Sequence, residues 1–295
     1  MKLVCFNPKN ISRGRELRYR IGAVVEGGQI ADLTPSILPM GLSAPEILRC
    51  YDLAANFVDP AMEAVSSGQL PLIDIGDVTI EAPVPRPGKI ICIGLNYRNH
   101  AVESGMAIPG SPIIFSKFSS CAIASGEAIK LPSASTQVDY EAELAFVIGR
   151  TASNVSAANA MEYVFGYTNF NDVSARDLQF ADGQWQRGKS CDTFAPMGEY
   201  VATPDEIGDP HGLRIQFRLN GETLQDSTTA ELIFKIPELI EFLSASITLE
   251  PGDVIATGTP PGVGFARKPP IFMKPGDIAE VEIEGLGILS NPVSS

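Results

Sequence analysis

The sequence contains only two histidines, His100 and His211, among its 295 residues. This scarcity excludes a zinc site built from three histidines and leaves carboxylates as the plausible metal ligands. Basic residues are also few, because 22 Lys and Arg stand against 35 Asp and Glu, which gives a formal net charge of −13. Nucleic acids and anionic membranes bind through lysine and arginine, so we expect neither as a partner. A small anionic substrate can still bind where a few cations gather.

Long apolar segments and paired cysteines are missing as well. No apolar run approaches the roughly 20 residues needed to cross a bilayer, so we expect a soluble protein. The five cysteines are odd in number and widely spaced, with no pair at metal-site spacing and no secretory segment at the amino terminus. Reduced thiols are the simplest explanation, and they predict a cytoplasmic location.

The composition is that of a folded protein, with 44% hydrophobic and 19% charged residues. The length allows one large domain or two unequal ones. The clearest boundary is at residues 81–88, where Pro83, Pro85 and Pro87 alternate with other residues and can continue neither a helix nor a central strand. We therefore predict a small amino-terminal domain over residues 1–82, a proline-rich linker over 83–88 and a larger domain over 89–295.

Short strands interrupted by glycine and proline dominate the pattern after residue 88. The clearest predicted strands cover residues 89–94, 112–117, 140–148, 213–219, 254–257 and 278–283. Helices are predicted over 157–164 and 237–246, and an amino-terminal hairpin over 19–25 and 29–33 precedes a short helix that starts near Asp59 and Pro60. Strands and helices do not alternate regularly, which disfavours a doubly wound parallel sheet. The pattern predicts a β-rich α+β fold.

Two glutamates one residue apart, Glu141 and Glu143, lie in a segment with a period of two. On a strand both side chains leave the same face, with Cα atoms about 6.5–7 Å apart because the rise is roughly 3.3 Å per residue. Like charges at this separation are costly unless a partner neutralises them, and a divalent cation does so directly. A solvated strand face is the alternative.

Further candidates for the same chemistry follow from two other segments. Asp172, where a strand is expected to end, is a possible third carboxylate, although an Asn-Asp pair at a turn is often a local backbone cap. His100 and Glu103 are three residues apart and share one face if the loop contains a helical turn. A carboxylate that orients a histidine ring is the usual general-base arrangement, and an exposed helix-surface pair is the alternative.

Several motifs together resemble a known family. They are Gly94-Leu95-Asn96-Tyr97 leading to His100, Glu141-Ala142-Glu143, the segment 171–177, Gly188-Lys189-Ser190 and the segment 256–260. In their order and spacing they resemble the fumarylacetoacetate hydrolase superfamily, from about Lys89 to the carboxyl terminus. The similarity is greatest to the group that contains 2,4-diketo-3-deoxy sugar acid hydrolases, acylpyruvases and chains labelled ureidoglycolate lyase.

This resemblance implies a mixed β-sandwich roll, a homodimer, and Mg²⁺ or Mn²⁺ bound through Glu141, Glu143 and Asp172. It also implies a lid that carries His100, as the base towards water, together with Glu103. The residues that would meet the substrate carboxylate and the developing negative charge are Arg176, Gln179, Lys189 and Thr257.

Other interpretations of these residues remain open from the sequence. Lys189 can be a surface lysine in a polar loop, and Arg176 can form a structural ion pair with Asp177. Lys117 also matches a family position, but an ordinary solvated strand lysine fits the pattern almost equally well.

The leading functional prediction is a metal-dependent hydrolase that cleaves a C–C bond in an acylpyruvate or 2,4-diketo acid. An oxaloacetate-type decarboxylase or a 2-hydroxymuconate-type isomerase that uses the same site is the alternative. A non-catalytic protein that binds a metal or ligand is a third possibility, but binding alone does not require the base that His100 and Glu103 provide.

Overall fold

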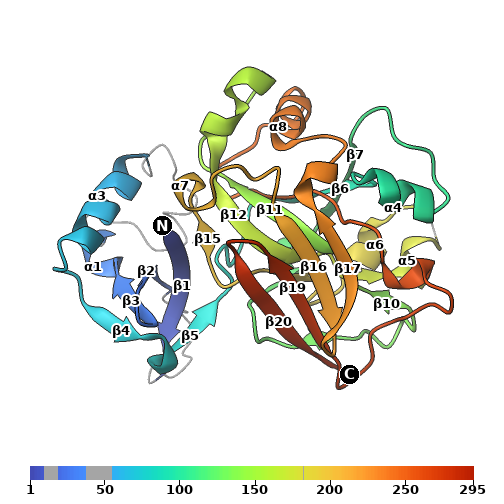
Figure 1. The fold of residues 1–295 in the computed structure, drawn as a ribbon, viewed down its shortest axis with the longest axis horizontal. Coiled ribbons are helices and arrows are strands. Elements are labelled where there is room, and N and C mark those ends of the chain that lie inside the picture. Colours follow the sequence, from blue (N-terminus) through green and yellow to red (C-terminus); the bar gives the residue numbers. More distant parts are fainter. Residues whose placement is uncertain (10–18, 38–54, 182) are drawn as a thin grey trace.

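The computed structural model describes residues 1–9, 19–37, 55–181 and 183–295. Its centre is a sandwich of two sheets, in which β11 and β12 of an 11-stranded sheet contact β16, β19 and β20 of a five-stranded sheet (Figure 1). Between the layers, the rings of Tyr140 and Phe217 stack with their centroids 4.0 Å apart. The expected β-rich α+β fold is confirmed.

The larger sheet combines the amino-terminal strands with strands from the middle of the chain and with β18 (Val254–Ala256). In spatial order its strands are β4 (Leu72–Asp74), β3 (Gln29–Asp32), β2 (Arg20–Val25), β1 (Lys2–Pro8), β15 (Val201–Ala202), β12 (Val164–Asn171), β11 (Ala142–Ile148), β18 (Val254–Ala256), β6 (Ile90–Gly94) and β7 (Ile113–Lys117), while β5 (Val78–Glu81) pairs with β1. The strands of the smaller sheet are β17 (Glu222–Thr228), β16 (Arg214–Leu219), β19 (Ile278–Ile283), β20 (Gly287–Ser294) and β9 (Ile129–Lys130). Two short pairs complete the strands: β10 (Val138–Asp139) with β13 (Ser174–Ala175), and β8 (Ala122–Ile123) with β14 (Ala195–Pro196).

The helices are short and lie around the sheets. They are α1 (Thr34–Ile37), α3 (Ala55–Ser66), α4 (Arg98–Glu103), α5 (Arg176–Gln179), α6 (Gln186–Lys189), α7 (Pro204–Ile207) and α8 (Ile236–Ser244), and the 3₁₀ turns are η2 (Ile75–Asp77), η3 (Ser119–Cys121), η4 (Ala157–Tyr163), η5 (Thr229–Glu231) and η6 (Gly264–Ala266). Figure 1 shows α4, α5 and α6 gathered at one end of the molecule, next to β6 and β7.

Two helix predictions need correction. The expected helix over 157–164 is a 3₁₀ turn, and α3 begins at Ala55, so that Pro60 lies inside it instead of opening it. The helix at 237–246 is confirmed as α8, where Pro237 lies in the first turn and Leu239, Ile240 and Leu243 are buried.

Strand β11 is buried along its whole length, whereas its period of two predicts one buried face. It pairs along its two edges with β12 and β18, and the smaller sheet packs on one of its faces. Because every residue of β11 is buried, the other face is covered as well, and a carboxylate on this strand is removed from water.

The amino-terminal strands continue the larger sheet, because Leu3 of β1 pairs with Val201 of β15. The division of the chain into two domains remains a prediction.

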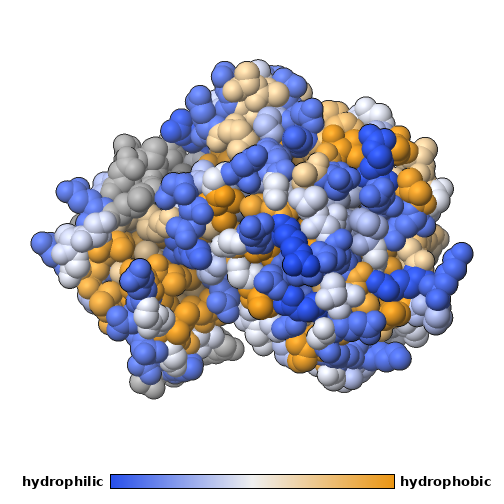
Figure 2. Space-filling model, in the orientation of Figure 1, coloured by the Kyte–Doolittle hydropathy of each residue, from blue (hydrophilic) through white to orange (hydrophobic). Residues whose placement is uncertain are grey.

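Figure 2 shows hydrophilic residues gathered over the outer face of the smaller sheet, where Arg218 pairs with Glu280 and Glu282. Within the described ranges, no helix is long and apolar enough to cross a membrane.

Candidate functional site

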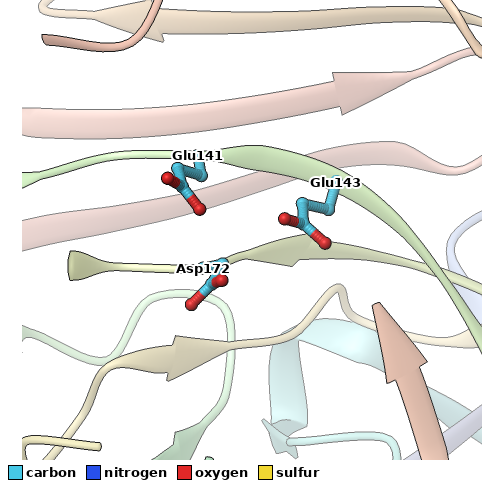
Figure 3. Close-up of side chains that lie close together, drawn as sticks. All are labelled: Glu141, Glu143 and Asp172. Atoms are coloured by element: carbon cyan, nitrogen blue, oxygen red, sulfur yellow. The ribbon is translucent and has the colours of Figure 1, made fainter. Parts of the chain in front are cut away.

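Three carboxylates meet where β11 begins and β12 ends. These strands are antiparallel, with Ala142 opposite Asn171, so Glu141, Glu143 and Asp172 lie at one end of the pair. One oxygen from each lies within 4.8 Å of the others, and Figure 3 shows Glu141 and Glu143 on the same side of their strand, directed towards Asp172. Their exposures of 5%, 1% and 0% contradict the alternative of a solvated strand face.

Buried cations compensate two of these carboxylates. Glu141 contacts the Lys189 ammonium at 2.6 Å and the Arg176 guanidinium at 2.7 Å. Burial alone raises the pKa of Glu141, but the charges of Lys189 and Arg176 outweigh it and hold that pKa well below its usual range. Asp172 contacts Lys117 at 2.5 Å and Lys189 at 2.8 Å, so its side chain is not a local backbone cap.

Glu143 lacks this compensation. One of its oxygens accepts a hydrogen bond of 2.8 Å from the backbone N–H of Gly258, and no cationic side chain in the described part of the chain pairs with it. Burial, together with the negative charges of Asp172 and Glu141, raises the pKa of Glu143 well above its usual range. A divalent cation among the three carboxylates would supply the missing positive charge, and oxygen ligands of this kind suit hard cations. The cluster is therefore compatible with a divalent metal.

Lys189 and Lys117 are both buried at this cluster. The Lys189 side chain, at the end of α6, is 2% exposed and bridges Glu141 and Asp172, which contradicts a position on the surface. Lys117, at the end of β7, donates to Asp172 and, at 3.0 Å, to the carbonyl oxygen of Val173. It is not a solvated strand lysine, and the sequence prediction of the site did not include it.

The histidine and glutamate of α4 also lie at the site. His100 Nδ1 is 2.8 Å from Glu103 Oε1, and the His100 side chain is buried. The N–H of Gly262 donates to both oxygens of Glu103, at 3.0 and 2.9 Å, which holds α4 against the chain that follows β18. The expected pair therefore forms, and His100 lines the same cleft as Glu141 and Glu143.

Arg176 is largely engaged by the protein itself. Its Nε donates to Asp139 at 2.8 Å, and its Nη1 donates to Gln179 at 3.0 Å. Asp139 also accepts hydrogen bonds from the N–H groups of Gly264 and Phe265, which line or flank the cleft. The structural partner of Arg176 is thus Asp139, because the neighbouring Asp177 instead accepts hydrogen bonds from Ser135 and Thr136.

Thr257 is not brought to the cleft. Its hydroxyl is fully buried and donates to the carbonyl oxygen of Leu144 at 2.9 Å. Gly258 has a φ of 104° and turns the chain, so that Thr259 lines the cleft in its place. Thr259 and Asp139 are polar residues of the site that the sequence did not reveal, and Lys117 is one whose role the sequence left open.

Both polar residues and apolar or aromatic residues line the cleft. The cleft is narrow, with a cavity volume of about 40 Å³. The polar residues that line it are His100, Ser104, Glu141, Glu143, Arg176, Gln179, Lys189 and Thr259. The apolar and aromatic ones include Met106, Phe115, Phe180, Trp185 and Phe265.

Comparison with known proteins assigns the chain to a family. Residues 89–294 match the model of the fumarylacetoacetate (FAA) hydrolase C-terminal domain. The chain is 46% identical over 268 residues to the oxaloacetate tautomerase Fahd2a, mitochondrial, of Rattus norvegicus, covering 90% of this chain and 84% of the rat protein. It is 44% identical over 277 residues to the oxaloacetate tautomerase fahd2, mitochondrial, of Xenopus laevis, covering 93% and 86%.

Solved structures confirm the expected fold type. Fumarylacetoacetate hydrolase from psychrophilic Exiguobacterium antarcticum matches with a TM-score of 0.82 at 36% identity. The 5-carboxymethyl-2-hydroxymuconate delta-isomerase from Mycobacterium smegmatis gives 0.72 at 33%, and the maleylpyruvate hydrolase from Sphingobium sp. SYK-6, in complex with manganese(II) ion and pyruvate, gives 0.78 at 31%. Each match covers 100% of this chain and 99% of the solved one. The chain belongs to the fumarylacetoacetate hydrolase family.

Proposed function

We propose that this member of the fumarylacetoacetate hydrolase family interconverts the keto and enol forms of a small 2-oxo diacid of the oxaloacetate type. The observation that carries the proposal is a cluster of three buried carboxylates, two of which, Glu141 and Glu143, line the same cleft as the carboxylate-oriented His100. The curated relatives named above are oxaloacetate tautomerases, and this supports the alternative of an oxaloacetate-type decarboxylase or 2-hydroxymuconate-type isomerase over the leading sequence prediction of a C–C hydrolase.

The metal would be held by Glu141, Glu143 and Asp172, and Mg²⁺ or Mn²⁺ fits their oxygen donors. When bound, such a cation would act as a Lewis acid towards the 2-oxo group of the substrate. Lys189, which contacts Glu141 and Asp172, adds a positive charge beside the oxygen on which negative charge develops.

His100 would transfer the proton. Because Nδ1 is engaged by Glu103, Nε2 is the ring nitrogen free to exchange a proton with C3 of the substrate. Glu103 fixes the ring and is itself held by the N–H of Gly262. Removal of a proton from C3 of the keto form gives an enolate, whose oxygen takes a proton from solvent to give the enol. In the reverse direction the enol oxygen loses its proton to solvent and His100 returns a proton to C3, which gives the keto form.

Gln179 and Thr259 are the proposed hydrogen-bonding contacts for the substrate, since both line the cleft. Arg176 would act mainly by positioning Gln179 and Glu141, because most of its donors are already used. Thr259 takes the role expected for Thr257.

Hydrolysis of a C–C bond is the second candidate. The same His100 and Glu103 could activate water instead of the C3 proton, and the Sphingobium structure is that of a hydrolase. Decarboxylation of oxaloacetate remains a further use of the same groups.

One assay separates these reactions. Enol oxaloacetate is added to the protein with Mg²⁺ or Mn²⁺, and the ultraviolet absorbance of the enol is followed together with pyruvate release. The proposal predicts accelerated loss of the enol without matching pyruvate release. If the enol decays at the uncatalysed rate while an acylpyruvate is cleaved, the hydrolase is the correct function.

Homodimer formation and the cytoplasmic location remain predictions. Light scattering of the purified protein tests the first. The alternative to the cytoplasmic location is a mitochondrial one, which the names of the rat and Xenopus relatives state for those proteins.

A further inference from the structure

Two hollows of the protein surface share one pair of aromatic side chains. Phe115 of β7 and Trp185, which precedes α6, line the active-site cleft and also line a groove that follows β7 outside it. No other described residue lines both hollows. The two rings meet edge to face, with centroids 5.4 Å apart and an interplanar angle of 68°. Together they form an aromatic wall between the cleft and the groove.

This aromatic wall is fixed by its surroundings. Trp185 packs on the backbone of Gly94, since a Cβ added at Gly94 would lie 2.7 Å from the indole Cζ3. The hydroxyl of Ser116, next to Phe115, donates to Gln186 Oε1 at 2.9 Å and so ties β7 to α6. The indole of Trp185 is thus held against the backbone of Gly94, and the strand that carries Phe115 is held to the helix that follows Trp185.

The aromatic wall is also close to the charged groups of the site. The Lys189 ammonium lies 4.9 Å from the centre of the Phe115 ring, and the same ammonium contacts Glu141 and Asp172. The N–H of Lys189 donates to the carbonyl oxygen of Trp185 at 3.0 Å, so one helical turn carries both side chains. A substrate whose 2-oxo acid end lies beside Lys189 therefore reaches the wall within a few bonds.

The groove on the far side offers apolar space along β7. Ile113, Ile114 and Phe118 line it, together with polar residues such as Gln184 and Gln186. A longer substrate could extend into this space if the wall were open.

We propose that Phe115 and Trp185 set the maximum length of the substrate, so that the protein accepts short 2-oxo acids of about the size of oxaloacetate and excludes longer ones. This specificity role deepens the proposed function and rests on it for the position of the 2-oxo acid end. Removal of the indole joins the cleft to the groove and admits longer chains.

Calorimetric titration at saturating Mn²⁺ tests the aromatic wall without requiring turnover. The ligands are oxalate and straight-chain 2-oxo acids from pyruvate to 2-oxooctanoate. Wild-type affinity should fall once the chain reaches the wall. Trp185→Ala should bind 2-oxooctanoate at least about tenfold more tightly than wild type does, since each methylene moved into an apolar groove contributes about fourfold. Oxalate, which is too short to reach the wall, should bind both proteins equally.

Phe180→Ala is the matched control, because Phe180 lines the cleft but not the groove. It should keep the wild-type dependence on chain length. An unchanged length dependence in Trp185→Ala, or an equal gain in Phe180→Ala, overturns the proposal.

Phe115→Leu shortens the other side chain of the aromatic wall. It tests the length limit if Trp185→Ala does not retain oxalate binding. A gain for 2-oxooctanoate in Phe115→Leu supports the wall, and no gain overturns it. Failure of the proposed function is recognised separately: the wild-type protein would then show the length limit in binding but would not accelerate the tautomerisation of oxaloacetate.

Discussion

The side-chain amide of Asn96 donates a hydrogen bond of 2.7 Å to the carbonyl oxygen of Thr257. Thr257 precedes Gly258, whose N–H donates to Glu143, and Asn96 lies just before α4, which carries His100. Asn96 also exchanges hydrogen bonds with the backbone of Phe234, donating to its carbonyl oxygen at 2.9 Å and accepting from its N–H at 2.8 Å. A single buried amide therefore connects the segment that holds the histidine to the segment that holds a carboxylate of the cluster.

We expect Asn96→Ala to lower the free energy of unfolding by about 2 kcal/mol or more, because it leaves buried backbone groups of Phe234 and Thr257 unpaired. Urea denaturation followed by circular dichroism measures the change. Asn99→Ala, at an exposed position of α4, is the control and should stay within about 0.5 kcal/mol of wild type. Equal stability of the two variants would contradict the role of Asn96.

Lys117→Met removes one of the two ammonium groups that contact Asp172. We expect a loss of about 3–5 kcal/mol in the metal-free protein, because Asp172 is left with an undercompensated buried charge. Addition of Mn²⁺ should recover part of this loss, since the cation neutralises the same carboxylate. Thermal unfolding with and without Mn²⁺ measures both effects, and the exposed Lys130→Met is the control. A wild-type unfolding temperature for metal-free Lys117→Met would refute the expectation.

His100→Ala should separate catalysis from binding. The variant should bind Mn²⁺ and oxalate almost as wild type does, because His100 is not one of the three clustered carboxylates. Its turnover of enol oxaloacetate should fall at least about 100-fold, the lower end of general-base contributions. Steady-state kinetics and calorimetry measure the two quantities. Unchanged turnover would remove His100 from the proposed reaction.

Trp185 is the only tryptophan of the chain, and it lines the cleft. Binding of 2-oxobutyrate, which has the same carbon chain length as oxaloacetate, with Mg²⁺ should therefore change the intrinsic fluorescence of the wild-type protein in a saturable way, with the midpoint that calorimetry gives. The same 2-oxo acid without a divalent cation should have a much smaller effect. Constant emission at ligand concentrations that saturate the calorimetric signal would mean that the 2-oxo acid binds outside this cleft.

The period of two in the sequence was sufficient to predict that Glu141 and Glu143 lie on one side of their strand. The distance to Asp172 could not follow from periodicity alone, since it depends on the antiparallel pairing of β11 with β12. The motifs of the family supplied that connection. Burial of Lys117 was equally out of reach, because a lysine at the end of a strand looks the same whether its face is covered or open.

Two other features depended on backbone details that residue patterns do not reveal. Thr257 and Thr259 are two residues apart and would share one face of an extended strand, but the positive φ of Gly258 turns the chain and separates their environments. Trp185 precedes Lys189 by four residues, a spacing that places both on one side of a helical turn. That spacing could have indicated that Trp185 lies near Lys189. It did so only if the segment is helical, and Gly188 does not favour a helix there.

Calorimetric titration of Mn²⁺ into wild type and Glu143→Gln tests whether Glu141, Glu143 and Asp172 together bind one divalent cation. Glutamine keeps the shape of Glu143 and removes a carboxylate with which no cationic side chain of the described residues forms an ion pair. We predict one Mn²⁺ per wild-type chain and no measurable binding in the variant, while circular dichroism shows the fold unchanged. Equal Mn²⁺ affinity in the two proteins would mean that Glu143 does not help to bind the cation.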